Sequence, residues 1–270
     1  MTIVTELKLH LRIQESLGGI QCVDLVECPS SGRLFIDKHT LMTSSTPDGR
    51  SASAAALNEL DLHLSVSDVE NVVKLERYAL HGDRLHLLHE YCTRGDLLDI
   101  LRQEHRLQTA GVSPQSSSMI TCTDDGRRKL FTGLLRGVQA LHRAGILHLD
   151  LSPENILVTE SEVVKVSDLG HARRFKHDQP SVRVVQVAKE AYAAPELFGD
   201  TEVEDGRLVD AWSLGVILWT LCTKRALLPL SKRPVSFGMY QLRVLTSLLV
   251  YFKLIRKKES RWSQRCSIRG

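Results

Sequence analysis

Residues 146–170 read ILHLDLSPENILVTESEVVKVSDLG, and the organisation of the remaining chain follows from them. Short runs of leucine and β-branched residues predict brief strands that carry polar side chains at their ends. Those polar side chains are Asp150, Asn155 and Asp168. A solvated surface does not account for polar residues spaced within apolar strands. The spacing therefore indicates a loop, a β-hairpin and a second loop that close on one site.

The same stretch resembles two loops of the eukaryotic protein kinases. The family patterns H-R-D-x-x-x-x-N and D-F-G correspond to HLDLSPEN over residues 148–155 and DLG over residues 168–170. The resemblance implies that Asp150 is the catalytic residue that receives or orients the proton of the acceptor hydroxyl. It also implies that Asp168 and the amide oxygen of Asn155 are ligands of Mg²⁺, a hard ion that prefers oxygen.

Composition limits the class of protein. With 270 residues, 43% hydrophobic and 25% charged, the chain is long and apolar enough for a globular protein with a sizeable core. No pair of its six cysteines has C-x-x-C spacing, and the first residues lack a signal-peptide pattern. We therefore expect a reducing, cytoplasmic location. No apolar run has the length and purity of a membrane-spanning helix.

The resemblance implies a two-lobed α+β fold. We expect a small, mostly β lobe over residues 12–91 and a larger, mostly helical lobe over residues 92–225. Alternation over residues 7–42 independently predicts an antiparallel meander, and the apolar spacing of residues 54–66 predicts a helix. A basic tail over residues 226–270 matches no family pattern.

In the small lobe, the resemblance implies nucleotide contacts for Gly18, Gly19 and Lys38. The two glycines stand where the family has a glycine-rich loop over the phosphates, and Lys38 would neutralise the α- and β-phosphates. Glu59 would pair with Lys38 and set its direction, so both belong to the catalytic set. The simpler explanations are a hairpin turn for the glycines and solvated surface charges for Lys38 and Glu59.

Between the lobes, residues 89–92 take the place of the segment that hydrogen-bonds the adenine in the family. Glu90 and Cys92 would contribute backbone groups there, and Asp96 would bind the ribose hydroxyls. Asp96 is equally suited to cap the helix predicted over residues 97–105, a role that needs no ligand.

Further motifs follow in the family's order. Residues 187–196, VAKEAYAAPE, end the activation segment, and Asp210 begins a predicted buried helix that would support the catalytic loop from beneath. Two positions depart from the family: Leu149 replaces an arginine that pairs with a phosphorylated activation segment, and Ser152 replaces a lysine that neutralises the transferred phosphate. We hypothesise that Lys189 partly restores this charge.

These motifs predict an ATP- and Mg²⁺-dependent protein serine/threonine kinase that phosphorylates protein hydroxyls. A pseudokinase or nucleotide-binding scaffold is the alternative, favoured by Ser152 and the thin glycine loop. A small-molecule kinase is a third, against which the A-P-E segment argues. We expect protein substrates and no nucleic-acid partner, and the sequence carries no signal for an oligomeric state.

The last 48 residues, from Thr223, contain twelve Lys and Arg against one acid, Glu259. Residues 239–255 fit an interfacial helix with weak contact to an anionic membrane. The explanation we favour is that the usual end of the large lobe has been lost, so that the large lobe is truncated.

Overall fold

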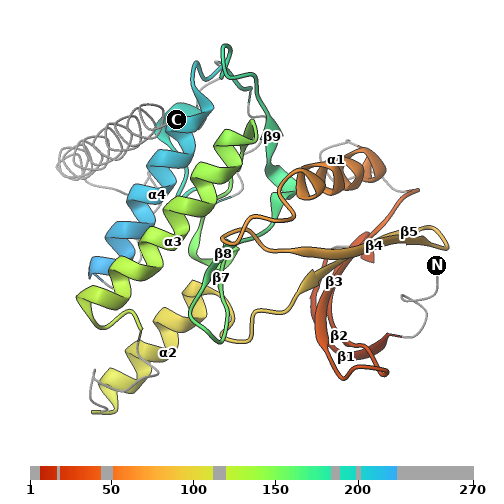
Figure 1. The fold of residues 1–270 in the computed structure, drawn as a ribbon. Helices are drawn as coiled ribbons and strands as arrows, with labels where there is room; N and C mark the ends of the chain where they lie inside the picture. The colour runs from red at the N-terminus through yellow and green to blue at the C-terminus, as the bar shows by residue number, and fades with distance from the viewer. Residues whose placement is uncertain are drawn as a thin grey trace, which may run out of the picture.

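The computed structural model describes residues 7–16, 19–43, 51–111, 120–183, 189–198 and 202–223. These residues form two lobes, one built on a five-stranded sheet and one built mainly of helices (Figure 1). The expected two-lobed α+β fold is confirmed. Gly18 and the tail over residues 226–270 lie outside the described residues.

The small lobe is an antiparallel sheet with strand order β1-β2-β3-β5-β4. Its strands are β1 (Lys8–Glu15), β2 (Gln21–Glu27), β3 (Leu34–Leu41), β4 (Leu75–His81) and β5 (Arg84–Glu90). The expected meander corresponds to β1–β3. β2 alternates between half-buried and buried positions because successive side chains of a strand point to opposite faces.

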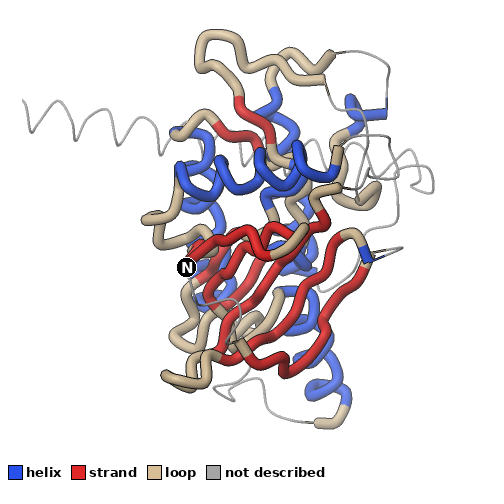
Figure 2. The backbone as a smooth tube through the Cα atoms, turned by 90° about the vertical axis from the view of Figure 1, so that its right-hand side faces the viewer, coloured by secondary structure: helices blue, strands red, loops and turns tan. Residues whose placement is uncertain are grey.

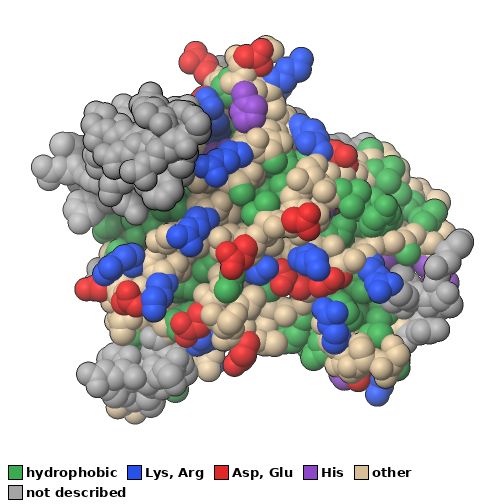
Figure 3. Space-filling model, in the orientation of Figure 1, with side chains coloured by type: hydrophobic (Ala, Val, Ile, Leu, Met, Phe, Trp, Pro, Cys, Tyr) green, Lys and Arg blue, Asp and Glu red, His purple; other side chains and the backbone are tan. Residues whose placement is uncertain are grey.

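Helix α1 (Ala52–Ser65) crosses beside the sheet (Figure 2). Its first turn is capped by Ser51, whose side chain accepts a hydrogen bond from the backbone N–H of Ala54. One face buries Ala56 and Leu62, and this face also carries the buried Glu59 toward β3. The opposite side of α1 contributes to the hydrophobic surface seen on the right of Figure 3.

The large lobe is organised around three helices in the described ranges. They are α2 (Leu97–Thr109), α3 (Asp124–Arg143) and α4 (Gly206–Thr223). Between α3 and α4 run the short strands β6 (Ile146–Leu147), β7 (Ile156–Val158), β8 (Val164–Val166) and β9 (Arg173–Arg174), and the 3₁₀ turns η3 (Pro153–Asn155), η4 (Leu169–His171) and η5 (Pro195–Phe198). β7 pairs with β8 and β6 with β9, both antiparallel. The predicted loop–hairpin–loop is therefore present.

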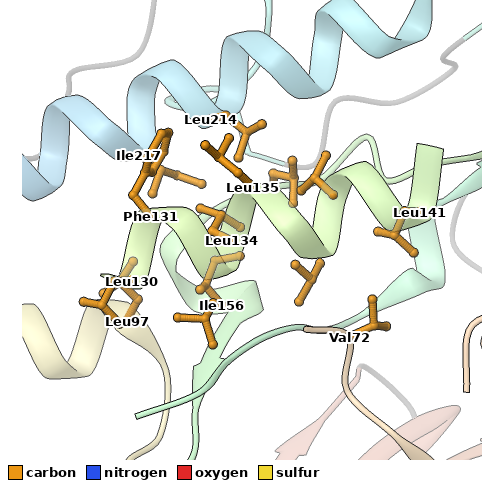
Figure 4. Packing of buried hydrophobic residues seen from close by; sticks show 14 of the residues in the cluster. Val72, Leu97, Leu130, Phe131, Leu134, Leu135, Leu141, Ile156, Leu214 and Ile217 are labelled. Carbon is orange, nitrogen blue, oxygen red and sulfur yellow. The ribbon is translucent and has the colours of Figure 1, made fainter. Parts of the chain in front are cut away.

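The main core lies where α3 meets α4 and the β7–β8 hairpin, and leucine is its most frequent residue (Figure 4). Gly137 of α3 lets the helix approach closely, because a Cβ there would lie 2.4 Å from the backbone oxygen of Asn71 and 2.8 Å from a methyl of Val166. The lobes are also joined here: Val73 N donates to Val166 O at 2.8 Å, and Val166 N donates to Asn71 O at 2.9 Å.

One predicted boundary is wrong. Helix α4 begins at Gly206, not at Asp210, so that Asp210 lies in the second turn and is fully buried. The apolar pattern predicted a later start because the charged Arg207 interrupts it. In the structure, the Arg207 side chain hydrogen-bonds to Asp205. None of the described helices combines the length and apolar content that a membrane-spanning segment requires.

Candidate active site

A cavity of about 560 Å³ opens between the two lobes. The small lobe contributes residues of β1, β2, β3, β5 and α1, and the large lobe contributes the loops around β7 and β8. Many of the residues implicated by sequence line it, namely Lys38, Glu59, Glu90, Cys92, Asp96, Asn155 and Asp168. The fold therefore gathers side chains from positions 38 to 168 around one cavity.

Lys38 occupies the centre of a three-residue charge cluster. Its ammonium lies 2.7 Å from Glu59 Oε1 and 2.8 Å from Asp168 Oδ1, so β3, α1 and the loop after β8 meet at one point. Burial alone would lower the pKa of Lys38, but Asp168 and Glu59 outweigh burial and raise this pKa. The pairing expected between Lys38 and Glu59 is present, and neither residue is a solvated surface charge.

Asp168 is held in its ionised form within that cluster. The nearby Lys38 ammonium lowers the pKa of Asp168, against the effect of burial. Its backbone is left-handed, with φ of +61°, and its Oδ1 accepts a hydrogen bond from Gly170 N at 3.2 Å. Such a conformation is unfavourable for a residue with a side chain. The adjoining contacts hold it, including Ser167 N donating to Asn155 O at 2.9 Å.

Asn155 and Asp150 are joined directly. The Asn155 amide nitrogen donates to Asp150 O at 2.8 Å and to Asp150 Oδ2 at 3.0 Å. Both hydrogen bonds use the nitrogen, which leaves the amide oxygen for another partner. The Asp150 side chain is only 6% exposed. Asp150 does not itself line the cavity, but its neighbours Asn155 and Lys189 do.

Asp210 supports the catalytic loop from below, in agreement with the family-based expectation. Its two carboxylate oxygens accept hydrogen bonds from His148 N at 2.9 Å and Leu149 N at 2.8 Å, and His142 Nε2 lies 2.8 Å away. Burial opposes ionisation, but these partners hold the pKa of Asp210 below its usual value. Leu149 has a left-handed φ of +64°, and the paired N–H groups stabilise that turn.

The oxygen groups present fit Mg²⁺. The Asp168 side chain is 40% exposed, and Asp168 and Asn155 both line the cavity. In the part of the chain that is described, no three His, Cys, Asp or Glu residues are placed to hold a metal by themselves. Two protein oxygens agree with an ion that takes its other ligands from phosphates and water.

Of the remaining nucleotide-binding candidates, some line the cavity and one does not. Gly19 has φ of +65° but is not among the cavity-lining residues. Asp96 lines the cavity and also caps α2, accepting a hydrogen bond from Asp99 N at 2.8 Å. Glu90 Oε1 lies 2.8 Å from Lys165 Nζ. Cys92 is buried, which raises the pKa of its thiol to about 12. Their roles in nucleotide binding stay predictions.

Two histidines lie together at the cavity, and sequence reasoning missed one of them, His63. His63 of α1 and His89 of β5 both line it, and their ring centroids are 4.7 Å apart. Burial, with Lys38 as a further cause, lowers the pKa of His63 to about 3, so both its side chain and that of His89 are neutral. One available signal was that His63 follows Glu59 by one helical turn.

Lys189 is brought to the catalytic loop. Its ammonium donates to Ser152 Oγ at 2.8 Å and lies 3.5 Å from Asp150 Oδ2. Lys189 lines the cavity, as its sequence position led us to expect. The side chain is 30% exposed.

Comparison with known proteins agrees with this geometry. A family model described as "Protein kinase domain" matches residues 22–267, a range that continues past residue 225. Cyclin-dependent kinase 20 of Danio rerio is 33% identical over 175 residues, which are 64% of this chain and 46% of that protein. Its Homo sapiens counterpart is 31% identical over 191 residues, or 70% of this chain and 50% of that protein.

A yeast relative extends the similarity over more of the chain. Serine/threonine-protein kinase ppk16 of Schizosaccharomyces pombe is 28% identical over 223 residues, which are 82% of this chain and 30% of that protein. The chain therefore spans about half the length, or less, of these curated relatives.

Proposed function

This chain belongs to the protein kinase domain family, and from that premise we propose that it is an ATP- and Mg²⁺-dependent protein serine/threonine kinase. The observation that carries the proposal is the meeting of Lys38, Glu59, Asp168 and Asn155 at one cavity between the lobes, where Asn155 is hydrogen-bonded to Asp150. Phosphoryl transfer asks a protein mainly for positioning and charge compensation, and these residues offer both.

The proposed reaction transfers the γ-phosphoryl group of ATP to a serine or threonine hydroxyl. The hydroxyl oxygen forms a bond to the γ-phosphorus, and the bond from that phosphorus to the β–γ bridging oxygen breaks. Its electron pair leaves with ADP, and Asp150 accepts the hydroxyl proton. Lys38 binds the α- and β-phosphates, and Glu59 keeps it directed there. Asp168 and Asn155 would hold Mg²⁺, which would neutralise phosphate charge.

A nucleotide-binding pseudokinase is the second candidate. The catalytic loop carries the neutral Ser152 where the family pattern has a lysine, and this favours weak transfer. Both candidates bind nucleotide, so that the rate of phosphotransfer separates them. Protein kinases act on protein substrates, and we propose the same class for this chain.

The test is phosphotransfer from labelled ATP by the purified chain with Mg²⁺, beside an Asp168→Asn variant. We expect the variant to lose about 100-fold in turnover, because it lacks the charge that opposes Lys38 and holds the metal. Asp125→Asn is the matched control, since Asp125 pairs with Lys129 on the surface of α3. Equal turnover by wild type and Asp168→Asn would remove the kinase proposal.

Nucleotide binding separates the pseudokinase from a failed site. A rise in melting temperature with ATP, but without transfer above the Asp168→Asn level, is the result that the pseudokinase proposal requires. If the chain shows no phosphotransfer and ATP does not raise its melting temperature, the result argues against both candidates.

We also propose a cytoplasmic location and weak contact of the tail with anionic membranes. The cysteine usage and the basic composition of residues 226–270 support these two proposals. Fractionation of cells that express the tagged chain tests the first. Co-sedimentation with phosphatidylserine vesicles, compared with neutral vesicles, tests the second.

A further inference from the structure

Three groups surround the Asp150 carboxylate, and one of them is an ammonium. Asn155 Nδ2 donates to Oδ2 at 3.0 Å, Lys189 Nζ lies 3.5 Å from the same oxygen, and His171 Nδ1 lies at 3.8 Å. Lys189 is therefore the permanent cation nearest to this carboxylate in the described part of the chain. The carboxylate itself is almost buried, whereas the Lys189 side chain is 30% exposed.

Ser152 fixes the direction of Lys189. Ser152 is fully buried, and its Oγ accepts a hydrogen bond from Lys189 Nζ at 2.8 Å. The ammonium has three donors, and one of them is used by this bond. The 3.5 Å separation from Asp150 is longer than a charge-assisted hydrogen bond, which is usually 2.7–2.9 Å. Lys189 thus retains donors for a further anionic partner in the cavity that it lines.

The other ammonium of the site, that of Lys38, is not paired with Asp150. Lys38 is occupied by Glu59 and Asp168, at 2.7 and 2.8 Å. The catalytic loop offers only the neutral hydroxyl of Ser152 two residues after Asp150. A phosphoryl group moving toward a hydroxyl at Asp150 carries negative charge into this region, and preorganised cations there lower the barrier.

We propose that Lys189 is a catalytic residue that contacts the γ-phosphoryl group, with Ser152 as the positioning residue that aims it. This inference rests on the proposed kinase function. During transfer, the phosphorus gains a bond to the acceptor oxygen and loses its bond to the β–γ bridging oxygen, whose electron pair leaves with ADP. Lys189 stays protonated and donates a hydrogen bond to a phosphoryl oxygen, and the hydroxyl proton passes to Asp150.

A different role for Lys189 makes the opposite prediction. As an internal counter-ion, Lys189 would only neutralise Asp150 and compete with the incoming hydroxyl. Its removal would then raise turnover or leave it unchanged, and nucleotide affinity would not depend on it.

The first measurement is steady-state phosphotransfer by Lys189→Met, Lys189→Arg and Lys129→Met variants of the full chain. We expect Lys189→Met to lower kcat about 100-fold and to raise the KM for ATP up to about tenfold, because the contact is present with bound ATP and strengthens in the transition state. Lys189→Arg should retain part of the rate. Lys129 lies on the surface of α3 and pairs with Asp125, so that Lys129→Met is the matched control for loss of a lysine.

The second measurement is charge relocation. The double variant Ser152→Lys, Lys189→Met places an ammonium on the catalytic loop and removes the Lys189 ammonium, which would otherwise repel the new one. We expect this double variant to recover at least about tenfold of the lost kcat, which a purely structural role of Lys189 does not predict. Melting temperatures of all variants show whether each one folds.

The third measurement needs no turnover. Equilibrium affinities for ATP and for ADP, measured by calorimetry, isolate the γ-phosphoryl contact. Lys189→Met should lower the ratio of ATP to ADP affinity about tenfold, since a hydrogen bond between charged groups is lost only with ATP. An unchanged ratio would overturn the proposal for Lys189 even if the chain is an active kinase. If the ratio of ATP to ADP affinity changes but no phosphotransfer is seen, the kinase function is rejected and the contact between Lys189 and the γ-phosphoryl group is supported. Absence of nucleotide binding would overturn both.

Discussion

His63 shows how burial at the site sets the protonation state of a single side chain. The side chain is 1% exposed, packs against the ring of His89 and has its Nε2 3.9 Å from Glu59 Oε1. The neutral form is favoured because burial penalises the charged ring and Lys38 repels it, which lowers the pKa to about 3. Glu59 is committed to Lys38 and does not offset this effect.

The lowered pKa of His63 predicts acid sensitivity. Below pH 6.5 the unfolded chain binds a proton on this residue and the folded chain does not, so that the free energy of unfolding falls as pH falls toward 3. Each such residue contributes a slope of up to about 1.4 kcal/mol per pH unit. We expect urea unfolding at pH 4.5–6.5 to show a shallower slope for His63→Leu than for the wild type.

The window is chosen to isolate histidine. Asp168 also loses stabilisation in acid, because its folded pKa is lowered, but that loss begins only near the ordinary pKa of an aspartate. The matched control is His105→Leu on the exposed side of α2, since the ring of His105 is in solvent in both states. A slope equally steep in His63→Leu and the wild type would contradict the prediction.

Single residues also mark the limit of sequence reasoning. Asp150, Asn155 and Asp168 were predictable because each lies in a motif with fixed spacing, and Lys38 because it precedes them in a fixed order. His63 and His89 come from a helix and a strand 26 residues apart, and only their packing makes them a pair. No local pattern records such a contact.

At the scale of elements, polar side chains link α1 to the large lobe near β9. Arg174 of β9 donates to Asp61 Oδ2 and to Ser65 Oγ, both at 2.6 Å, and Asn58 Nδ2 lies 3.5 Å from Ala172 O. Figure 1 shows α1 next to the segment that carries β9. This link holds the helix where Glu59 reaches Lys38. Arg174 is thus a positioning residue for the charge cluster.

Removing Arg174 should therefore affect activity more than stability. The Arg174 and Asp61 side chains are 45% and 65% exposed, and such pairs contribute only about 0–1 kcal/mol to folding. We expect Arg174→Ala to lower kcat at least about fivefold with a small change in melting temperature, because α1 is then free to move away from Lys38. Steady-state kinetics and thermal unfolding measure the two effects.

The charge reversal Arg174→Asp with Asp61→Arg tests whether the link itself matters. The double variant should recover activity relative to either single change, and the recovery should shrink at high salt, which screens exposed charges. Arg102→Ala is the control, since Arg102 forms an exposed pair with Asp99 far from α1. Losses in the two single variants that simply add would show that the residues act separately.

Elements were predicted better than their limits. The meander and the helices predicted over residues 54–66 and 97–105 follow from alternation or helical spacing that local burial preserves. The start of α4 could not be predicted in this way. Arg207 forms an ion pair with Asp205, and this pairing allows a charged residue in the first turn of the helix. The close approach of α3 to Asn71 was also hidden, because a glycine in a helix indicates tight packing only once its neighbour is known.

At the scale of the molecule, the order of the motifs predicts two lobes but not how they are coupled. Besides the chain connection through residues 91–96 and the contacts of Lys38 and α1 described above, the lobes are joined along β8. Asn71 and Val73 pair with Val166 through the backbone, and Glu90 of β5 forms an ion pair with Lys165 of β8 at 2.8 Å. The resemblance implies a nucleotide contact through the backbone of Glu90, and this stays a prediction. The Glu90 carboxylate bridges the lobes and also accepts a hydrogen bond from Lys74 N at 2.8 Å.

Loss of the Glu90–Lys165 pair should uncouple the lobes. The two side chains are only 22% and 13% exposed, so Lys165→Met leaves a half-buried carboxylate with less compensation. We expect hydrogen exchange in β3–β5 to accelerate about fivefold, equivalent to ~1 kcal/mol, while α3 and α4 keep their protection. In the wild type, the slowest amides of both lobes should open with similar free energies. Lys74→Met is the matched control, because Lys74 pairs with Glu76 within the small lobe. Equal acceleration in both lobes would mean that the pair stabilises the whole chain and does not couple its halves.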